Sequence, residues 1–524
     1  MTRLRRRALT AAGLTAVGVA AMAMPAMAQE RNPTVETLNE GLTVLGTNIN
    51  LLWVVIGAVL VVFMQAGFAL VETGFCRAKH AAHVVSTNFA IFGLGFVGFF
   101  FVGYALAFGG FSSALIGLEE PTGSALIGSG HWVFLWKGGF AFSGVKPELL
   151  AATSGFFLYM VAFMDTVATI PTGAMAERWK WKSFVMWGLF CGALFYPLFA
   201  AWTWGGGWLS QLGNSLELGF GYVDFAGSGV VHAVGGVAAL AGALVLGPRI
   251  GKYGRDGKPR ALPGHHIPMA MLGTFILLFG WFGFNAASTL AATDIQFATV
   301  AVNTAIAGAF GAVVAMFWIT RRTGKPDPGM MANGMLAGLV AITAPCAFVQ
   351  PWAAAVIGTI SGVVVIEAVF FIERKLKVDD PVGAIAVHGV NGTLGVLYVG
   401  IFSSGMYGAG WNLTTEGPAA SATGVTGILY DLDLGGRQLL SQAIGAVIVW
   451  TVILGLACAF FKIQDKLTKG GIRPAEEDEL AGLDLPEMGV LAYPEFDGAS
   501  GSLQLERGTR VVETEVETEK VLST

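Results

Sequence analysis

Apolar stretches of membrane-spanning length recur along almost the whole of this 524-residue chain. A helix needs about 20 residues to cross the hydrocarbon core of a bilayer. Eleven stretches approach that length, at 49–72, 84–108, 151–176, 184–204, 223–247, 267–289, 296–320, 329–346, 350–372, 383–403 and 437–461. Charged residues make up only 13% of the chain, about half the share that soluble proteins carry. The sequence therefore predicts an all-α polytopic membrane protein with eleven transmembrane helices.

The N-terminus has the form of a targeting peptide. Four arginines between positions 3 and 7 precede an apolar stretch from Ala8 to Met24, and Ala26-Met27-Ala28 follows as a small-x-small cleavage site. We therefore predict a cleavable signal peptide over residues 1–28 and a transmembrane domain over residues 29–461. An uncleaved first membrane helix is the alternative, although its apolar core is short for spanning a bilayer.

Hydrophilic sequence follows the last apolar stretch. Residues 462–494 mix acidic and apolar side chains, a pattern that suits a cytoplasmic tail docking on the membrane domain. Beyond Pro494 the composition turns polar and rich in Glu, which is typical of disorder. We predict a cytoplasmic tail over residues 462–494 and a disordered extension over residues 495–524.

Loop charges predict the orientation of the chain. Cytoplasmic loops of membrane proteins carry an excess of Lys and Arg, and here every second loop is basic. The basic residues of these loops are Arg77, Lys79, Arg178, Lys180, Lys182, Arg249, Lys252, Arg255, Lys258, Arg260, Arg321, Arg322, Lys325, Arg374, Lys375 and Lys377. We predict a multi-pass protein of the cell inner (plasma) membrane, with its N-terminus outside after signal cleavage and its C-terminus in the cytoplasm. Basic residues spread over short loops indicate no nucleic-acid partner.

One motif occurs twice. Asp224-Phe-Ala-Gly-Ser-Gly-Val-Val-His232 is echoed by Asp380-Pro-Val-Gly-Ala-Ile-Ala-Val-His388, and both separations are eight residues (232 − 224 and 388 − 380). The motifs lie in the fifth and tenth stretches, which cross the membrane in opposite directions. Five spans therefore form an inverted repeat, and the eleventh helix lies outside it. Each histidine lies roughly 12 Å from its aspartate along a helix, so both approach the midplane of a bilayer about 30 Å thick.

Two imidazoles near the midplane have four possible uses. The four alternatives are that the imidazoles ligate a metal, that they relay a proton, that they hydrogen-bond a small polar solute, or that they only hydrogen-bond each other and stabilise the fold. Ionisable groups inside a membrane are costly, which favours a functional role. Neither repeat supplies a second ligand one helical turn away, so metal binding is the minor alternative. Two neutral imidazoles share a proton and offer both a donor and an acceptor to a solute.

Aromatic residues frame the outer side of the same region. Phe284 and Ser288, four residues apart, share one helix face, as do Tyr159 and Phe163, and Trp204 ends the fourth span. Each ring alone is explained by packing or by the interfacial aromatic belt. Together with the histidines they suggest a site that holds a small cation by cation–π attraction and one hydrogen bond, above phenyl rings that exclude water.

Acidic residues near the span ends have less specific explanations. Asp224 either binds a cation or caps its helix, and the Phe225-Ala226-Gly227 sequence at a plausible helix start favours capping. Asp380, which precedes a proline, is interpreted in the same way. Glu72 and Glu367 lie near the inner ends of their spans, where we expect solvent to reach them.

Several motifs together resemble a known family. Asp-Phe-Ala-Gly-x-x-Val-Val-His, Trp-Phe-Gly-Phe-Asn-Ala-x-Ser, Val-His-Gly-Val-x-Gly and the tail pattern Arg-x-x-x-Glu-x-Glu-x-x-Gly-Leu-Asp are similar to the ammonium transporter/methylammonium permease/Rhesus family. The likeness covers about residues 48–494. It implies a bacterial ammonium transporter, not an enzyme and without a cofactor, that forms a homotrimer of eleven-helix subunits with one pore each.

The resemblance also implies roles for single residues. Trp204, Phe163, Ser288 and the acid Asp224 resemble the outer site that binds ammonium or methylammonium. Phe163 and Phe284 resemble the gate, and His232, His388 and Trp281 resemble the pore lining. Tyr159 stands where relatives often have Phe, so the resemblance assigns it no role.

The matched tail implies regulation. Members of the family are commonly controlled by a trimeric PII-type nitrogen-signalling protein at the cytoplasmic face, so the resemblance implies such a partner for residues 462–494. An ammonium sensor that signals through the tail with little flux is the alternative function. A metal transporter or metalloenzyme is the alternative from another class.

Overall fold

The computed structural model describes residues 34–494, 504–505 and 511–512. The chain divides into two compact units, Met1–Asn48 and Ile49–Thr524, and the boundary falls within the first described helix, α2 (Val35–Phe75). The predicted signal peptide over residues 1–28 lies outside the described residues. So does the predicted extension over residues 495–524, except for strands β5 (Gln504–Leu505) and β6 (Val511–Val512), which pair antiparallel.

Helices dominate the described chain. The first five spans are α2; α3 (Ala81–Gly98) with η2 (Phe99–Gly103) and α4 (Tyr104–Phe108); α5 (Leu150–Met175); α6 (Trp181–Phe190) with η6 (Cys191–Phe195) and α7 (Tyr196–Trp202); and η7 (Ser228–Ala233) with α9 (Val234–Leu246). The next five are α10 (Ile267–Ala286); α11 (Gln296–Thr323); α12 (Pro328–Ile342); α13 (Pro351–Phe371) with η9 (Ile372–Leu376); and η10 (Ile385–Val390) with α14 (Asn391–Phe402). The last is α15 (Leu432–Ile448), η13 (Val449–Ile453) and α16 (Leu454–Leu467).

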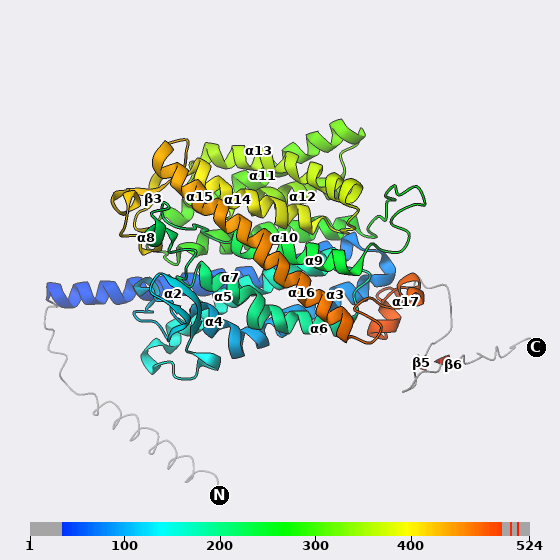
Figure 1. The fold of residues 1–524 in the computed structure, drawn as a ribbon, viewed down its shortest axis with the longest axis horizontal. Helices are drawn as coiled ribbons and strands as arrows, with labels where there is room; N and C mark the ends of the chain where they lie inside the picture. The colour runs from blue at the N-terminus through cyan, green and yellow to red at the C-terminus, as the bar shows by residue number, and fades with distance from the viewer. Residues whose placement is uncertain (1–33, 495–503, 506–510, 513–524) are drawn as a thin grey trace, which may run out of the picture. The chain divides into compact units, whose positions relative to one another are not determined.

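Shorter elements occupy the loops and the tail. They are β1 (Ser124–Ser129), β2 (Trp132–Lys137), β3 (Ser404–Gly408), β4 (Gly424–Thr426), α8 (Leu212–Leu216), α17 (Glu476–Ala481), η1 (Ala78–His80), η3 (Ala114–Ile116), η4 (Phe140–Phe142), η5 (Pro147–Leu149), η8 (Ala287–Thr289), η11 (Trp411–Leu413), η12 (Pro418–Ser421) and η14 (Asp484–Met488). β1 pairs with β2 and β3 with β4, both antiparallel. β3 and α8 lie at one end of the helical bundle, which we call the outer end, and α17 lies at the other, the inner end (Figure 1).

The predicted multi-span architecture is confirmed. Within the described residues, ten helical segments have the length and hydropathy to cross a membrane, and α12 is a shorter apolar helix of 15 residues. α12 stops early because the chain turns at Thr343, and the backbone N–H groups of Phe225 and Ala226 donate to the carbonyls of Ala344 and Thr343. Within regular helices the backbone groups of each span bond within their own helix, and the groups left over at Phe225 and Ala226 find partners at the end of α12.

The two halves of the bundle repeat one packing scheme in opposite directions. α3 packs on α5 and α6 in the first half, as α11 packs on α12 and α13 in the second. α5 packs on α9, as α12 packs on α14. Asp224 lies beside Trp204 at the outer end, whereas Asp380 lies beside Lys252 and Glu373 at the inner end. The five-helix repeat is therefore inverted, and α15–α16 lies outside it.

The fifth and tenth spans meet where both helices begin as π-helical segments, η7 and η10. A Cβ atom added to Gly236 would lie only 2.1 Å from the backbone nitrogen of Gly389. Only glycine permits this approach, which resembles the small-residue contacts of other membrane helix pairs. The crossing brings the residues just before it, His232 and His388, into the centre of the bundle.

Buried ion pairs hold the inner end together. The Arg249 guanidinium lies 2.9 Å from both Glu177 and Asp379, and all three residues are at most 3% exposed. Burial opposes the ionisation of Asp379, but Arg178 and Arg249 outweigh it, so the pKa of this carboxyl group lies below its ordinary value. These residues come from three loops that are far apart in the sequence, and their pairing fixes the loops against one another.

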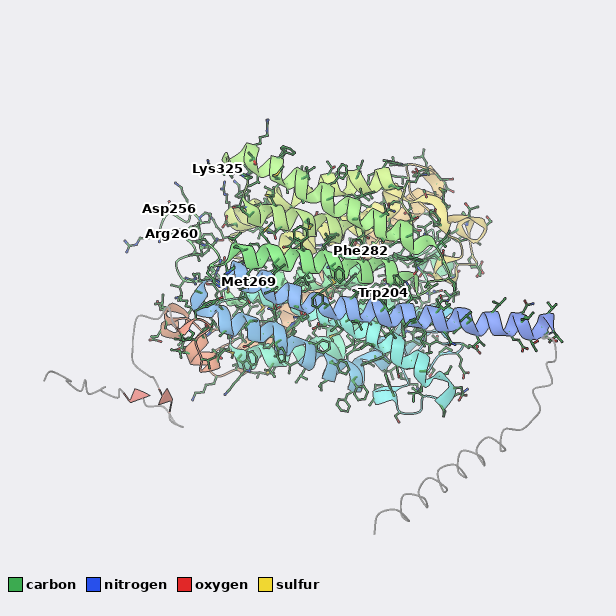
Figure 2. The ribbon with its side chains drawn as sticks, turned by 180° about the vertical axis from the view of Figure 1, so that it is seen from behind. Trp204, Asp256, Arg260, Met269, Phe282 and Lys325 are labelled. Carbon is green, nitrogen blue, oxygen red and sulfur yellow. The ribbon has the colours of Figure 1, made fainter. Side chains whose placement is uncertain are left out.

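The tail folds onto this inner end. The guanidinium of Arg473 donates to the carbonyls of Leu246 and Pro248 at the end of α9 and pairs with Glu479. Glu479 in turn accepts a hydrogen bond from the backbone N–H of Ile250. Residues 462–494 therefore dock on the membrane domain. Figure 2 shows Asp256, Arg260 and Lys325, from two of the predicted cytoplasmic loops, at the inner end and away from Trp204.

Candidate functional site

The two repeated histidines face each other in the centre of the bundle. Nδ1 of His232 lies 3.1 Å from Nδ1 of His388, and their rings are stacked at 5.2 Å with an interplanar angle of 27°. His232 is fully buried and His388 is 5% exposed. One Nδ1 must donate and the other accept, so the pair holds one shared proton between its facing nitrogens. The sequence prediction that both histidines meet near the middle agrees with this geometry.

An aromatic cavity opens at the outer end. Its volume is about 420 Å³, and its lining includes Phe163, Trp204, Ser288, Asp224 and Tyr159. The Phe163 and Trp204 rings meet edge to face at 5.5 Å. Trp204 is held in place because its Nε1–H donates to the carbonyl of Asp224 at 2.7 Å. Two aromatic rings and a hydroxyl group lining one cavity are the chemistry that holds a small cation.

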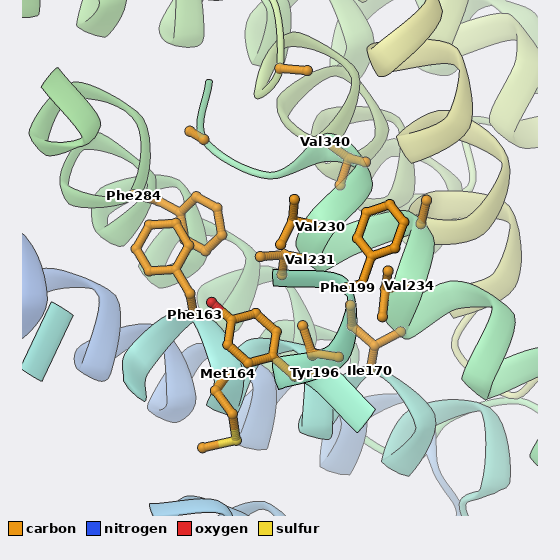
Figure 3. Close-up of a cluster of buried hydrophobic side chains, with 14 of the residues drawn as sticks. Phe163, Met164, Ile170, Tyr196, Phe199, Val230, Val231, Val234, Phe284 and Val340 are labelled. Atoms are coloured by element: carbon orange, nitrogen blue, oxygen red, sulfur yellow. The ribbon is translucent and has the colours of Figure 1, made fainter. Parts of the chain in front are cut away.

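Phe163, which lines this cavity, packs against a second phenyl ring, that of Phe284. The Phe163 and Phe284 ring centroids are 4.1 Å apart, and neither side chain is exposed. Figure 3 shows the two rings facing each other beside Val230 and Val231 of η7. Phe284 also lies over His232, with ring centroids 5.4 Å apart. The groups therefore neighbour one another in the order cavity, Phe163, Phe284, His232 and His388.

Asp224 acts as the acceptor for the start of η7. Its carboxylate accepts hydrogen bonds from the backbone N–H groups of Gly227, Gly229 and Val230, all at 2.8 Å. Gly227 has φ +113°, a conformation that favours glycine, and a Cβ atom there would also contact Trp204. Asp380 makes the equivalent bonds to Gly383 and Ile385 at 3.0 and 2.7 Å. Both contacts favour the capping interpretation over direct ligation of a cation.

Trp281 forms the wall beside the histidines. Its ring stacks on His232 at 5.1 Å, and its Nε1–H donates to the hydroxyl of Thr343 at 2.9 Å. The sequence did not indicate Thr343, because it lies within the predicted span 329–346, away from the histidine motifs, and belongs to no motif of its own. Nε2 of His232 has no hydrogen-bond partner among the described residues, so this edge of the ring is available to a solute.

Tyr159, to which the resemblance assigns no role, belongs to the outer cavity. Its hydroxyl lies 3.0 Å from the Ser288 hydroxyl and also contacts the carbonyls of Gly283 and Phe284. Its ring meets Phe163 at 4.7 Å. The shared helix face of Tyr159 and Phe163 was the only signal available in the sequence. Trp411, from a loop distant in the sequence, also lines the cavity. No pattern in the sequence of the spans indicated this contribution.

The expectation that Glu72 is solvated was wrong. Glu72 is 2% exposed, because α2 continues to Phe75 and carries this side chain into the bundle against α3 and α5. Glu367, by contrast, is partly exposed and pairs with Arg322. Over residues 34–494 and the four further described positions, no group of three His, Cys, Asp or Glu residues is arranged to hold a metal.

Together these features define a class of protein. A bundle of membrane-length helices encloses an aromatic cavity, a pair of packed phenyl rings and two buried imidazoles in series, and this arrangement suits a membrane transport protein. The profile of the Ammonium Transporter Family matches residues 52–493. The chain belongs to this family, so the resemblance drawn from the motifs is confirmed at that level.

Individual relatives agree with this assignment. Over 450 residues the chain is 44% identical to Ammonium transporter Amt2 of Archaeoglobus fulgidus, covering 86% of this chain and 89% of that protein. It is 33% identical over 463 residues to Ammonium transporter 1 member 3 of Solanum lycopersicum, covering 85% and 93%. Among solved structures, a Sensor Amt Protein matches with a TM-score of 0.72, 35% identity and coverage of 85% and 99%. Candida albicans Mep2 matches with a TM-score of 0.68, 28% identity and coverage of 86% and 92%.

Proposed function

We propose that this ammonium transporter binds NH4+ in the outer cavity and passes its nitrogen through the pore as NH3. The cation rests against the rings of Trp204 and Phe163 and donates a hydrogen bond to Ser288. The observation that supports this best is the sequence of groups behind the site: a closed phenyl pair 4.1 Å apart, followed by two imidazoles 3.1 Å apart. Methylammonium is an alternative substrate of the same site.

Deprotonation follows from the solvation of the two species. The closely packed rings of Phe163 and Phe284 leave no room for the hydration shell of NH4+, and burying an unpaired charge costs many kcal/mol. NH3 has no such penalty, so the neutral species crosses the phenyl gate and reaches His232 and His388. The proton has two routes. It follows along the imidazole pair and gives net charge transfer, or it returns to the outer side and leaves a channel for neutral ammonia.

Replacing both histidines by leucine distinguishes these routes. Purified protein in liposomes is pulsed with ammonium, then methylammonium, with sodium as the control, on a solid-supported membrane. A current that saturates with ammonium and decays faster at higher protein density demonstrates charge transfer by the wild-type protein. The double variant His232→Leu/His388→Leu is expected to lose this current while melting and eluting as the wild type does. An unchanged current would refute the relay.

Several further features belong to the proposal. The inner end faces the cytoplasm, because the basic loops gather there. The source cell in this proposal is bacterial. The N-terminus lies outside after removal of the signal peptide over residues 1–28. Subunits assemble as a homotrimer, and the docked tail over residues 462–494 is the contact site for a PII-type protein. Chemical crosslinking of the purified protein tests the trimer, and co-elution with such a protein tests the partner.

A sensor is the second candidate function. It is supported by the 35% identity to the solved Sensor Amt Protein and by the tail contacts at the end of α9. Ammonium uptake in a strain that lacks other ammonium transporters separates the two functions. A transporter restores growth at low ammonium, whereas a sensor binds ammonium without restoring growth.

A further inference from the structure

A buried carboxylate lies on the inner side of the histidine pair. Glu72 of α2 accepts a hydrogen bond from the Asn88 amide at 2.7 Å and lies 2.8 and 2.9 Å from the Thr172 hydroxyl. It is 2% exposed and forms no salt bridge within the described part of the chain. Charged groups inside membranes are usually paired with an opposite charge. A carboxylate stabilised only by neutral donors therefore needs another explanation than ion pairing.

Its hydroxyl partner suits either protonation state of the carboxyl group. The Thr172 hydroxyl lies 2.5 Å from the carbonyl of Thr169 as well as next to Glu72. A hydroxyl has one hydrogen and accepts on its other side. When Glu72 is ionised, Thr172 donates to it. When Glu72 is protonated, it donates to Thr172, which turns its hydrogen to the Thr169 carbonyl. Both states are hydrogen-bonded without moving the backbone.

Glu72 shares a small cavity with the inner histidine. The cavity is lined by both Glu72 and His388, with Asn333 as a further polar group and Phe68 and Val387 among the apolar ones. Its volume is about 20 Å³, which is room for about one water molecule. A single water between an imidazole and a carboxylate completes a path for a proton.

We propose that Glu72 is the acceptor that takes the proton from the histidine pair on the inner side of the pore. The inference rests on the proposed function and extends it, because it supplies the exit of the relay that the histidines begin. The proton of NH4+ passes to an imidazole nitrogen, and NH3 is released into the pore. His388 then gives its proton, through one water, to the Glu72 carboxylate. Glu72 releases the proton to the cytoplasm, so NH3 and H+ both arrive inside.

Glu72→Gln tests the proposal, since the amide keeps the shape and the hydrogen bonds but carries no exchangeable acid proton. Asp165→Asn is the matched control: it neutralises a carboxyl group that is also buried in the bundle, 3% exposed, but that does not line the cavity with His388. Current is recorded from both variants and from the wild type. Entry of neutral ammonia is followed separately, through the alkalinisation of an encapsulated pH dye.

The expected result is selective. Glu72→Gln should lose about tenfold or more of the ammonium-evoked current while neutral ammonia entry stays within about twofold of the control. Glu72→Asp, which restores a carboxyl group, should recover part of the current. A current in Glu72→Gln equal to that of Asp165→Asn would overturn the proposal. Absence of current in the wild type would instead refute the electrogenic function on which it rests.

If Glu72→Gln does not assemble, Thr172→Val tests the same step. Valine keeps the shape of threonine but removes the hydroxyl that partners both states of Glu72. We expect a several-fold smaller current with unchanged entry of neutral ammonia. A current equal to that of the wild type, from a protein that elutes and melts normally, would overturn the proposal.

Discussion

Replacing Asp224 separates its two possible roles, because its carboxylate already has three backbone partners. Both oxygens are occupied: Oδ1 accepts from Gly227, and Oδ2 accepts from Gly229 and Val230. The residue is 2% exposed, so water does not replace these bonds when the side chain is removed. Asp224→Ala and Asp224→Asn therefore remove defined numbers of hydrogen bonds.

The expected losses follow from that count. Asp224→Ala leaves three buried N–H groups without an acceptor, at about 1–3 kcal/mol each before the helix relaxes. We expect the free energy of unfolding to fall by about 3 kcal/mol or more, since relaxation recovers only part of this loss. Asp224→Asn keeps an oxygen for Gly229 and Val230 and presents an NH2 group to Gly227. Its cost should be about 1–2 kcal/mol.

Thermal melting of the purified variants, followed by tryptophan fluorescence, measures this order. Asp431 provides the matched control, because it caps α15 through two backbone bonds at 2.9 Å but is exposed to solvent. Removing an exposed cap costs about 1 kcal/mol. Asp224→Ala should melt well below Asp431→Ala. Equal melting temperatures would refute the capping explanation, and a stable Asp224→Asn without any current would show that the charge itself binds the cation.

Two further perturbations test other parts of the molecule. Tyr159→Phe removes the hydroxyl that positions Ser288, and the ammonium concentration giving half-maximal current should rise by about two- to tenfold, with the maximal current nearly unchanged; an unaltered concentration dependence would argue against this role. Arg249→Met removes the buried cation that pairs with both Glu177 and Asp379, and should destabilise the inner end by about 3–5 kcal/mol, measured as a lower melting temperature. Because the pKa of Asp379 is depressed in the folded protein, its contribution is complete at neutral pH and is lost only on acidification below about pH 4. On acidification, the melting temperature of the wild type should therefore fall more steeply than that of Arg249→Met. Parallel plots of melting temperature against pH would contradict this link between Asp379 and Arg249.

Much of the architecture was predictable because it is encoded in local patterns. Hydropathy marks the spans, since each must match the thickness of a bilayer on its own. The echo of Asp224 and His232 in Asp380 and His388 predicted the inverted repeat, because both copies use the same cap and the same spacing. These features need no knowledge of which helices are neighbours.

Contacts between spans were predictable only in part. The meeting of Phe163, Trp204 and Ser288 depends on three separate spans, and the resemblance to a family indicated it where periodicity alone did not. Glu72 shows the limit most clearly. Its position near a span end suggested solvent, but its partners Asn88 and Thr172 come from two other helices. Neither helix carries a signal in its own sequence that it will face a carboxylate.

The inverted repeat also clarifies where a direction of transport arises. Both copies contribute the same elements, an aspartate that caps the start of a π-helical segment and a histidine at the centre, so these parts alone treat the two sides of the membrane alike. The ends differ. The outer end has a cavity of about 420 Å³ with Trp204 and Ser288, whereas the inner side has one of about 20 Å³ with Glu72. If the proposed function holds, cation capture and proton release therefore belong to residues outside the repeated motif. Substitutions of Trp204, Ser288 or Glu72 should change the direction of transport, or the coupling of proton to ammonia transport, while leaving the fold intact.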